Sequence, residues 1–119
     1  MSVKKSLAAL SAGTFGLGVA EFAMMAVLPY VAADLRVSIP TAGNWVSAYA
    51  VGVCCGAPLL VWGRTRPLKQ LLVALIGLMV AGNLLAAASS SYWSLMLARF
   101  VSGLPHGAYF GVASLVALK

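Results

Sequence analysis

Three side chains that can carry or exchange a proton stand within otherwise apolar stretches of this sequence. Glu21 interrupts the apolar run that starts near Ser6, and Arg99 and His106 lie seven residues apart within Leu97–Gly111. An ionised side chain at the centre of a membrane-spanning helix costs about 2.5–3.5 kcal/mol on insertion scales. Such residues therefore usually face a bundle interior or a water-filled cavity, and they mark the path of a substrate or a proton.

The rise of a helix predicts that Glu21 and Arg99 lie at a similar depth. Glu21 follows Ser6 by about 22 Å and Arg99 follows Trp93 by about 9 Å, at roughly 1.5 Å per residue. If the two helices enter from opposite sides of a hydrocarbon core of roughly 30 Å, both residues fall in its outer half. They can pair if their helices are neighbours. The alternatives are that Arg99 extends toward the surface or that the pair is purely structural.

Other polar, aromatic or flexible apolar side chains share helix faces with these charged residues. Residues three, four and seven positions apart are neighbours on a helix, which groups them into one stripe on each of two helices. We expect this set to line a substrate cavity: Thr14, Met25, Ser102, His106, Tyr109 and Phe110. His106 also has a structural interpretation, because Pro105 frees a carbonyl that a histidine can hydrogen-bond.

Small residues recur every four positions in two of the apolar stretches. Gly52 and Gly56 belong to one such row, and Gly103, Gly107 and Gly111 form the other. Rows of this kind let helix backbones approach closely in lipid. We therefore expect these five glycines to pack helices together, and Tyr49, beside the first row, is expected to be a packing residue too.

The elements that carry these residues are four long apolar blocks, at about 6–33, 44–63, 70–88 and 92–118. With 62% hydrophobic and 8% charged residues, the chain has too few polar residues to cover a soluble domain. Each block reaches the roughly 17–25 residues that a spanning helix needs, and none alternates as a barrel strand does. The sequence predicts an all-α membrane protein, with four transmembrane helices in a single transmembrane domain over residues 1–119.

The positive charges lie where a four-span topology places them on one side. The net charge is +6, and a Lys/Arg excess marks cytoplasmic loops. The cations of that side are Lys4, Lys5, Arg64, Arg66, Lys69 and Lys119, whereas the other side has only Arg36, beside Asp34. The charge therefore predicts that both termini lie in the cytoplasm, and it gives no indication of nucleic-acid binding.

The first block is longer than the core of a secretory signal peptide. Such a core has about 7–15 apolar residues and ends at a cleavage site with small residues. Here the apolar character resumes after Glu21. We therefore expect a retained spanning helix.

No motif for an enzyme, a cofactor or a metal stands in the sequence. Cys54 and Cys55 are adjacent, which disfavours a disulfide, and no further cysteine or second histidine completes a metal site. They are expected to be buried, inert thiols. We expect neither catalysis nor a bound cofactor.

Two long stretches of the sequence resemble one family of transporters. These are "GTFGLGVAEFAMMAVLPYVAADLRVSIPTAGNWVSAYAVGVCCGAPLL", from Gly13, and "LARFVSGLPHGAYFGV", from Leu97, with the basic turn between them. Together they resemble the N-terminal part of major facilitator superfamily transporters, in particular the AraJ-like members of the drug:proton antiporter-1 branch. The motif residues are Pro29, Gly56–Ala57–Pro58, Arg99, Gly103 and Gly107.

The resemblance implies a proton-coupled efflux transporter of sugars or amphipathic drugs. It implies that Glu21 exchanges a proton or binds a cation and that Arg99 modulates that exchange. It also implies a fold of two six-helix halves built from three-helix repeats. This chain supplies four helices of the first half, so we expect it not to transport without the remainder. One departure is the loop between Gly56 and Gln70, where the family usually carries an aspartate and this chain has no acid.

Two other functions stay open from the sequence. A complete four-helix exporter of the small multidrug-resistance type, acting as a dimer of two copies of the chain (a homo-oligomer), has this size and one functional glutamate in its first helix. A non-transporting membrane protein is the third possibility.

Overall fold

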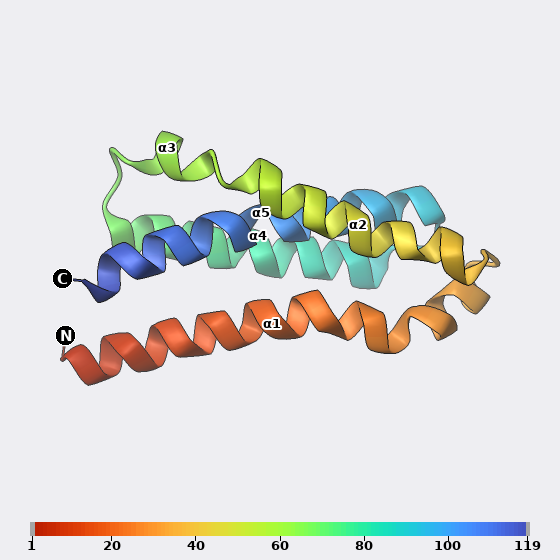
Figure 1. Ribbon diagram of the computed structural model, residues 1–119, viewed down its shortest axis with the longest axis horizontal. Helices are drawn as coiled ribbons and strands as arrows, with labels where there is room; N and C mark the ends of the chain where they lie inside the picture. Colours follow the sequence, from red (N-terminus) through yellow and green to blue (C-terminus); the bar gives the residue numbers. More distant parts are fainter. Residues whose placement is uncertain (1, 119) are drawn as a thin grey trace.

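The computed structural model describes residues 2–118, which form helices joined by short turns (Figure 1). The helices are α1 (Val3–Asp34), α2 (Ile39–Gly56), α3 (Leu59–Gly63), α4 (Leu68–Ala88) and α5 (Tyr92–Ala117). The start of α1, the α3–α4 turn and the end of α5 lie at one end of the bundle, and the α1–α2 turn lies at the other. The all-helical class predicted from the sequence is confirmed.

Serine side chains begin three of the helices. The side chain of Ser2 accepts a hydrogen bond from the backbone N–H of Lys5 at the start of α1. Ser91 forms a reciprocal capping box with Ser94 at the start of α5. Ser38 accepts the backbone N–H of Thr41, so α2 begins at Ile39 and not near residue 44. The helix therefore starts before the apolar block, and Pro40 fits its first turn, where the missing N–H of proline has no partner to lose.

The second predicted block is divided in the structure. It forms α2 and the short α3, which are separated at Ala57 and Pro58. Three helices are long and apolar enough to cross a membrane, namely α1, α4 and α5. The predicted spans near 6–33, 70–88 and 92–118 therefore each correspond to such a helix, while a fourth span through α2 stays a prediction.

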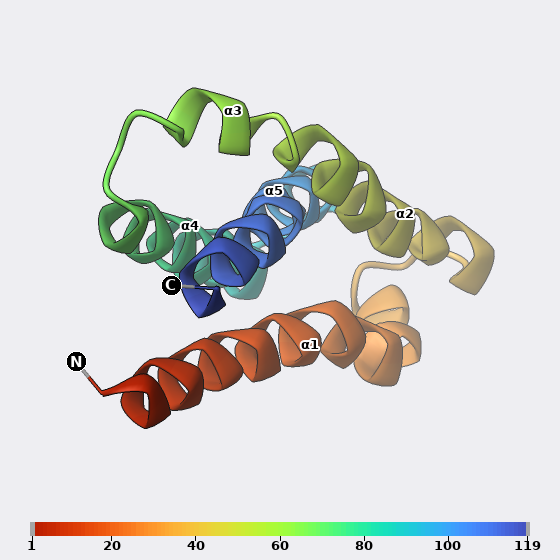
Figure 2. The same cartoon turned by 60° about the vertical axis from the view of Figure 1, so that its left-hand side comes forward.

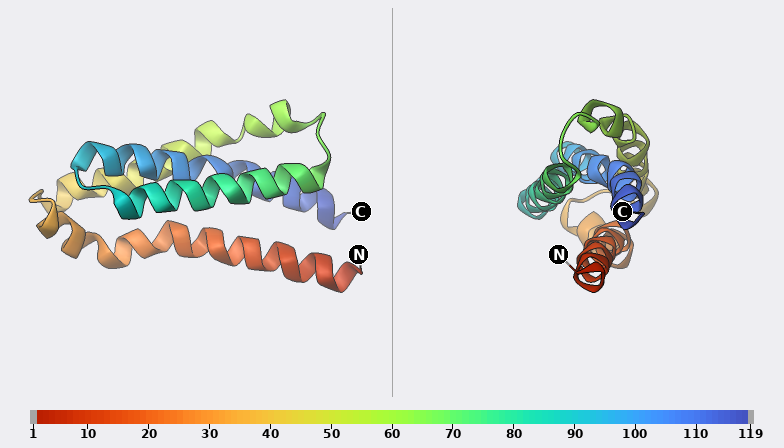
Figure 3. Two further views of the ribbon diagram at one scale, coloured as in Figure 1. Left: turned by 180° about the vertical axis from the view of Figure 1, so that it is seen from behind. Right: turned by 90° about the vertical axis from the view of Figure 1, so that its left-hand side faces the viewer.

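Helix α5 lies between α2 and α4, and α1 runs along the open side of this group (Figures 1 and 2). The left view in Figure 3 shows the ribbon of α1 separate from those of the other long helices along much of its length. The contacts of α5 with α2 and with α4 are far more extensive than those of α1 with any helix. The bundle thus has a tight three-helix group and one loosely attached helix.

Glycines set the close approach of α2 and α5. At four of them, an added Cβ would overlap the backbone of the opposite helix: Gly52 lies against Phe100, Gly56 against Leu104, Gly103 against Tyr49 and Gly107 against Val53. Gly111 lies against the side chain of Leu60 in α3. On the other side of α5, Gly82 of α4 lies against Ser102. The absence of side chains at these positions is what lets the helices touch along their backbones.

Helix α1 packs through two small apolar clusters. Leu17 joins Leu75, Ala108, Tyr109 and Val112 in one of them. Nearer the α1–α2 turn, the second cluster consists of Ala32, Ala42, Trp45 and Leu95. Between these two clusters lies the part of α1 that carries Glu21.

Large apolar side chains cover much of the outer surface of the bundle. Phe15, Val73, Leu84 and Trp93 are each more than 60% exposed. Such surfaces suit helices surrounded by lipid, where apolar side chains face outward. Cys54 and Cys55 are also exposed, and both are free thiols. The prediction that they are buried was therefore wrong.

Candidate functional site

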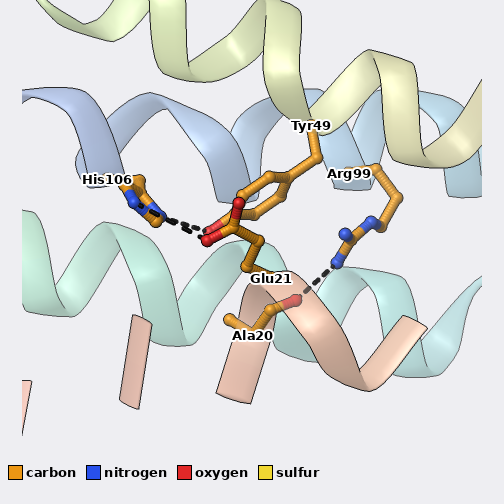
Figure 4. Close-up of polar contacts among 5 residues, drawn as sticks. All are labelled: Ala20, Glu21, Tyr49, Arg99 and His106. Atoms are coloured by element: carbon orange, nitrogen blue, oxygen red, sulfur yellow. Dashed lines mark hydrogen bonds and ion pairs between the residues drawn. The ribbon is translucent and has the colours of Figure 1, made fainter. Parts of the chain in front are cut away.

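Polar side chains from three helices meet between the two apolar clusters. Glu21 comes from α1, Tyr49 from α2, and Arg99 and His106 from α5 (Figure 4). The spacing of Arg99 and His106, two helical turns apart, brings both to the side of α5 that faces α1 and α2. We call these four residues the polar cluster.

His106 is the centre of the polar cluster. Its Nδ1 lies 2.9 Å from the hydroxyl of Tyr49, within hydrogen-bond distance. Its Nε2 lies 3.9 Å from Oε2 of Glu21, so the carboxylate is close without being hydrogen-bonded. The side chain of His106 is 15% exposed, and that of Glu21 is 39% exposed. Glu21 is therefore the member that the surroundings can reach most easily.

Arg99 is buried beside them, with 2% of its surface exposed. Its Nη1 donates to the backbone carbonyl of Ala20 at 3.0 Å, which ties α5 to α1. Its guanidinium carbon lies 4.5 Å from the centre of the Tyr49 ring, a cation–π contact. Its Nε and Nη2 are buried without a hydrogen-bond partner in residues 2–118. Two donors of a buried cation are thus left free.

The direct pair of Glu21 with Arg99 that similar depths suggested is not formed. Figure 4 shows Glu21 directed toward His106, while Arg99 reaches the carbonyl of the preceding residue, Ala20. The helices are neighbours, as that pairing required, but their side chains diverge. Depth along a helix does not fix the direction of a side chain around it, and the rotamers here place Tyr49 between the acid and the guanidinium.

Tyr49 is the member of the polar cluster that the sequence did not indicate. It is 3% exposed and contacts both Arg99 and His106. A helix-wheel signal was present, because Tyr49 precedes Gly52 by three residues and therefore shares the face that packs on α5. An aromatic residue on a packing face is usually a core residue, so this signal alone does not indicate a polar role.

The other predicted cavity residues lie around the cluster in different surroundings. Ser102 is buried against Gly82 of α4, and its hydroxyl donates to the carbonyl of Ala98. Tyr109 is buried, and its hydroxyl donates to the carbonyl of Leu10 in α1. These two side chains point away from the cluster toward neighbouring helices.

The remaining three are exposed. Phe110 stacks at a tilt on His106, with 5.2 Å between ring centres. Met25 lies one turn of α1 beyond Glu21. Thr14 donates to the carbonyl of Leu10 and lines a hollow of about 460 Å³ between α1 and α5. Tyr109 lines another of about 560 Å³ between α1 and α4. Neither of these two hollows is lined by a member of the polar cluster.

The polar cluster can store and pass a proton. A carboxyl group and an imidazole both exchange protons with neighbours, and the phenol of Tyr49 can donate to or accept from the imidazole. A fixed cation in the same apolar interior biases where a negative charge is stable.

Comparison with known proteins assigns the chain to a family. The family model of the Major Facilitator Superfamily matches residues 10–118. The chain is 48% identical to the putative transporter AraJ of Escherichia coli K12 and 44% identical to the inner membrane transport protein YdhP of the same organism, each over 98% of this chain. It is 32% identical to a chloramphenicol resistance protein of Streptomyces lividans over 87% of this chain. No solved structure gives a significant match.

The chain spans about 30% of the length of AraJ and of YdhP, and 27% of the chloramphenicol resistance protein. The family match covers all four members of the polar cluster and both glycine rows. The helices that it covers include the three that are able to span a membrane. The chain belongs to the Major Facilitator Superfamily of membrane transporters.

Proposed function

We propose that this chain forms the first four spans of a proton-coupled efflux transporter, with α2 and α3 together making the second span. The observation that carries the proposal is the polar cluster, which connects a carboxylate on α1 with a buried cation on α5 inside an apolar bundle. Ionisable groups are retained in such surroundings chiefly where an ion or a proton has to pass.

In this proposal Glu21 is the group that takes up and releases the coupled proton. It is the most exposed member of the cluster and the one acid within a span, since the chain's other acid, Asp34, ends α1. Arg99 is held by α1 and faces the cluster across the ring of Tyr49. A proton on Glu21 changes the charge balance at the contact between α1 and α5, and that change is the link to helix movement.

The substrate in this proposal is a small amphipathic molecule. The match to a chloramphenicol resistance protein supports this class. Met25 and Phe110 offer exposed apolar surface on the two helices that carry Glu21 and His106, and flexible methionines suit varied ligands. Sugars are the alternative class, and the experiment below separates the two.

The proposed orientation places both ends of the chain in the cytoplasm of a bacterium, with the bundle in the inner membrane. Lys4 and Lys5 lie in the first turn of α1. Arg64 and Arg66 lie in the α3–α4 turn and Lys69 in the first turn of α4, at the same end of the bundle in Figure 1. Basic residues accumulate on the cytoplasmic side.

The family match counts against an exporter of the small multidrug-resistance type, since it places the chain in another family.

A chimera tests the proposal. This chain replaces the 118 residues of AraJ to which it aligns, and the chimera is reconstituted in vesicles that contain a pH-sensitive dye. Chloramphenicol is added to one sample, and single mono- and disaccharides are added to others. One of these two classes of compound is expected to cause protons to leave the vesicles. Glu21→Gln is expected to abolish that release, because an amide cannot take up the proton.

Asp34→Asn is the matched control, because it removes an exposed acid at the end of α1 and should leave the release unchanged. Proton release that survives Glu21→Gln would contradict the role of Glu21. Vesicles with this chain alone are expected to show no release. Coupled efflux from those vesicles would contradict the need for further helices.

A further inference from the structure

The two ring nitrogens of His106 face different partners on different helices. Nδ1 faces the hydroxyl of Tyr49 on α2, and Nε2 faces the carboxylate of Glu21 on α1. These are the titratable side chains that contact the imidazole from the helices packed against it, while Arg99 of its own helix lies over the ring of Tyr49. The position of the hydrogen on a neutral imidazole depends on which nitrogen finds an acceptor.

The hydrogen-bond partners of Tyr49 decide which ring nitrogen of His106 carries the hydrogen. Tyr49 is buried, and its hydroxyl has one hydrogen-bond partner among residues 2–118, which is Nδ1 of His106. A buried hydroxyl that kept its hydrogen unpaired would lose the free energy of a hydrogen bond. Tyr49 therefore donates and Nδ1 accepts, which leaves the hydrogen of the neutral imidazole on Nε2.

Arg99 strengthens this assignment. Its guanidinium lies against the ring face of Tyr49 and draws electron density from the phenol, which makes the hydroxyl a better donor. This contact supports Tyr49 as the donor and Nδ1 of His106 as the acceptor.

The hydrogen on Nε2 then faces Glu21. The separation of 3.9 Å is too long for a hydrogen bond, but Glu21 is partly exposed and a small rotation of its side chain closes the gap. The ionised carboxylate accepts this hydrogen. When Glu21 takes up a proton, the oxygen that carries it becomes a donor, and the hydrogen bond at that oxygen is lost.

We infer that Tyr49 is a positioning residue that holds His106 in the tautomer with its hydrogen on Nε2 and thereby makes His106 the hydrogen-bond donor to the Glu21 carboxylate. The chain of contacts from Arg99 to Glu21 then runs through Tyr49 and His106, without a direct ion pair. This inference rests on the proposed role of Glu21, but its geometry is testable without transport.

The experiment uses nitrogen resonances of the full chain in lipid nanodiscs. The chain has one histidine, so labelling histidine with ¹⁵N gives the two ring nitrogens of His106 alone. The unaltered chain at alkaline pH is expected to carry its hydrogen on Nε2 and none on Nδ1. Tyr49→Phe should shift the Nδ1 resonance, because the donor is gone. Glu21→Gln should shift the Nε2 resonance and leave Nδ1 in place.

Tyr109→Phe is the matched control, because it removes another buried hydroxyl that does not contact His106. Neither ring nitrogen should move in that variant. A hydrogen on Nδ1 in the unaltered chain would overturn the inference, and so would an Nδ1 resonance that Tyr49→Phe leaves unchanged. If Tyr49→Phe does not fold, the spectrum of the unaltered chain decides alone. A chimera without proton coupling but with the expected spectra would count against the proposed function only.

Discussion

Helix α5 makes two different kinds of contact with its neighbours. Against α2 its glycines touch backbone carbonyls directly, so the two helices approach as closely as helices can. Against α1 it makes few contacts, and several of these are polar: the guanidinium of Arg99 on the carbonyl of Ala20, the hydroxyl of Tyr109 on the carbonyl of Leu10, and His106 beside Glu21. The α2–α5 contact therefore depends on close packing of the backbones, whereas the α1–α5 contact depends on hydrogen bonds.

This difference separates a fixed part of the bundle from a part that can move. Close-packed interfaces have one arrangement and resist displacement, because any shift creates overlaps or voids. Hydrogen bonds between helices in membranes are worth only about 0.6–2 kcal/mol each, so a few of them can be exchanged. The α2–α5 contact is thus a rigid scaffold, and the α1–α5 contact is where protonation of Glu21 can shift a helix.

The largest expected effect is at the α2–α5 contact. Gly103→Leu places a side chain where the backbone of Tyr49 now lies. We expect the free energy of unfolding in detergent to fall by about 3 kcal/mol, the upper end of the cost of an overpacked core. Denaturant titration followed by circular dichroism measures this loss. A stability within error of the unaltered chain would contradict the close approach of the two helices.

A smaller effect is expected from Arg99→Ala at the α1–α5 contact. The change removes the hydrogen bond to Ala20 and the cation–π contact with Tyr49, while it also removes two buried donors without partners. These terms oppose one another, so we expect a net loss of roughly 1–2 kcal/mol in the same titration. Arg64→Ala, in an exposed turn, is the control and should have no effect. A loss as large as that of Gly103→Leu would mean that α1 is not the weaker contact.

Tyr109→Phe sharpens the comparison further. It removes one interhelical hydrogen bond, from Tyr109 to the carbonyl of Leu10, and keeps the buried ring. The expected loss is about 0.6 kcal/mol, the average for such bonds in membrane bundles. Thermal unfolding of the two proteins side by side measures it. A loss of unfolding free energy larger than that of Arg99→Ala would mean that Tyr109, and not Arg99, makes the stronger polar contact between α1 and α5.

The smallest effect is expected at Gly77 of α4. An added Cβ meets nothing within 4 Å there, so Gly77→Leu should change the free energy of unfolding by less than about 0.5 kcal/mol. This variant carries the same substitution as Gly103→Leu at an open position. Equal losses from the two would show that leucine disturbs any glycine of this bundle, and the comparison would fail.

The helices and the glycine contacts follow from patterns that a single sequence contains. Continuous apolar blocks locate α1, α4 and α5, and the four-residue spacing of glycines identifies the faces that approach closely. Helix α2 starts before its apolar block, because Ser38 caps it and Pro40 is compatible with a first helical turn.

The polar cluster was predictable only in part. Charge in an apolar stretch singled out Glu21, Arg99 and His106, since the cost of burying a charge is large for any fold. The contacts among these residues depend on their rotamers and on how α1 packs against α5. Neither of these produces a periodic pattern in the sequence. Tyr49 could not be predicted for the same reason, because its polar role depends on the contact of its hydroxyl with Nδ1 of His106.

The central claim is that α1 is held more weakly than α2 and α4, and that Arg99 holds it. Distances between spin labels test this directly. In a chain with Cys54→Ser and Cys55→Ser, one pair of labels at Val19→Cys and Val51→Cys joins α1 to α2.

A second pair, at Val51→Cys and Val80→Cys, joins α2 to α4, and all three valines are exposed. After Arg99→Ala, we predict a broader and longer distance distribution for the first pair and no change for the second. Equal broadening of both pairs, or no change in the first, would contradict the account.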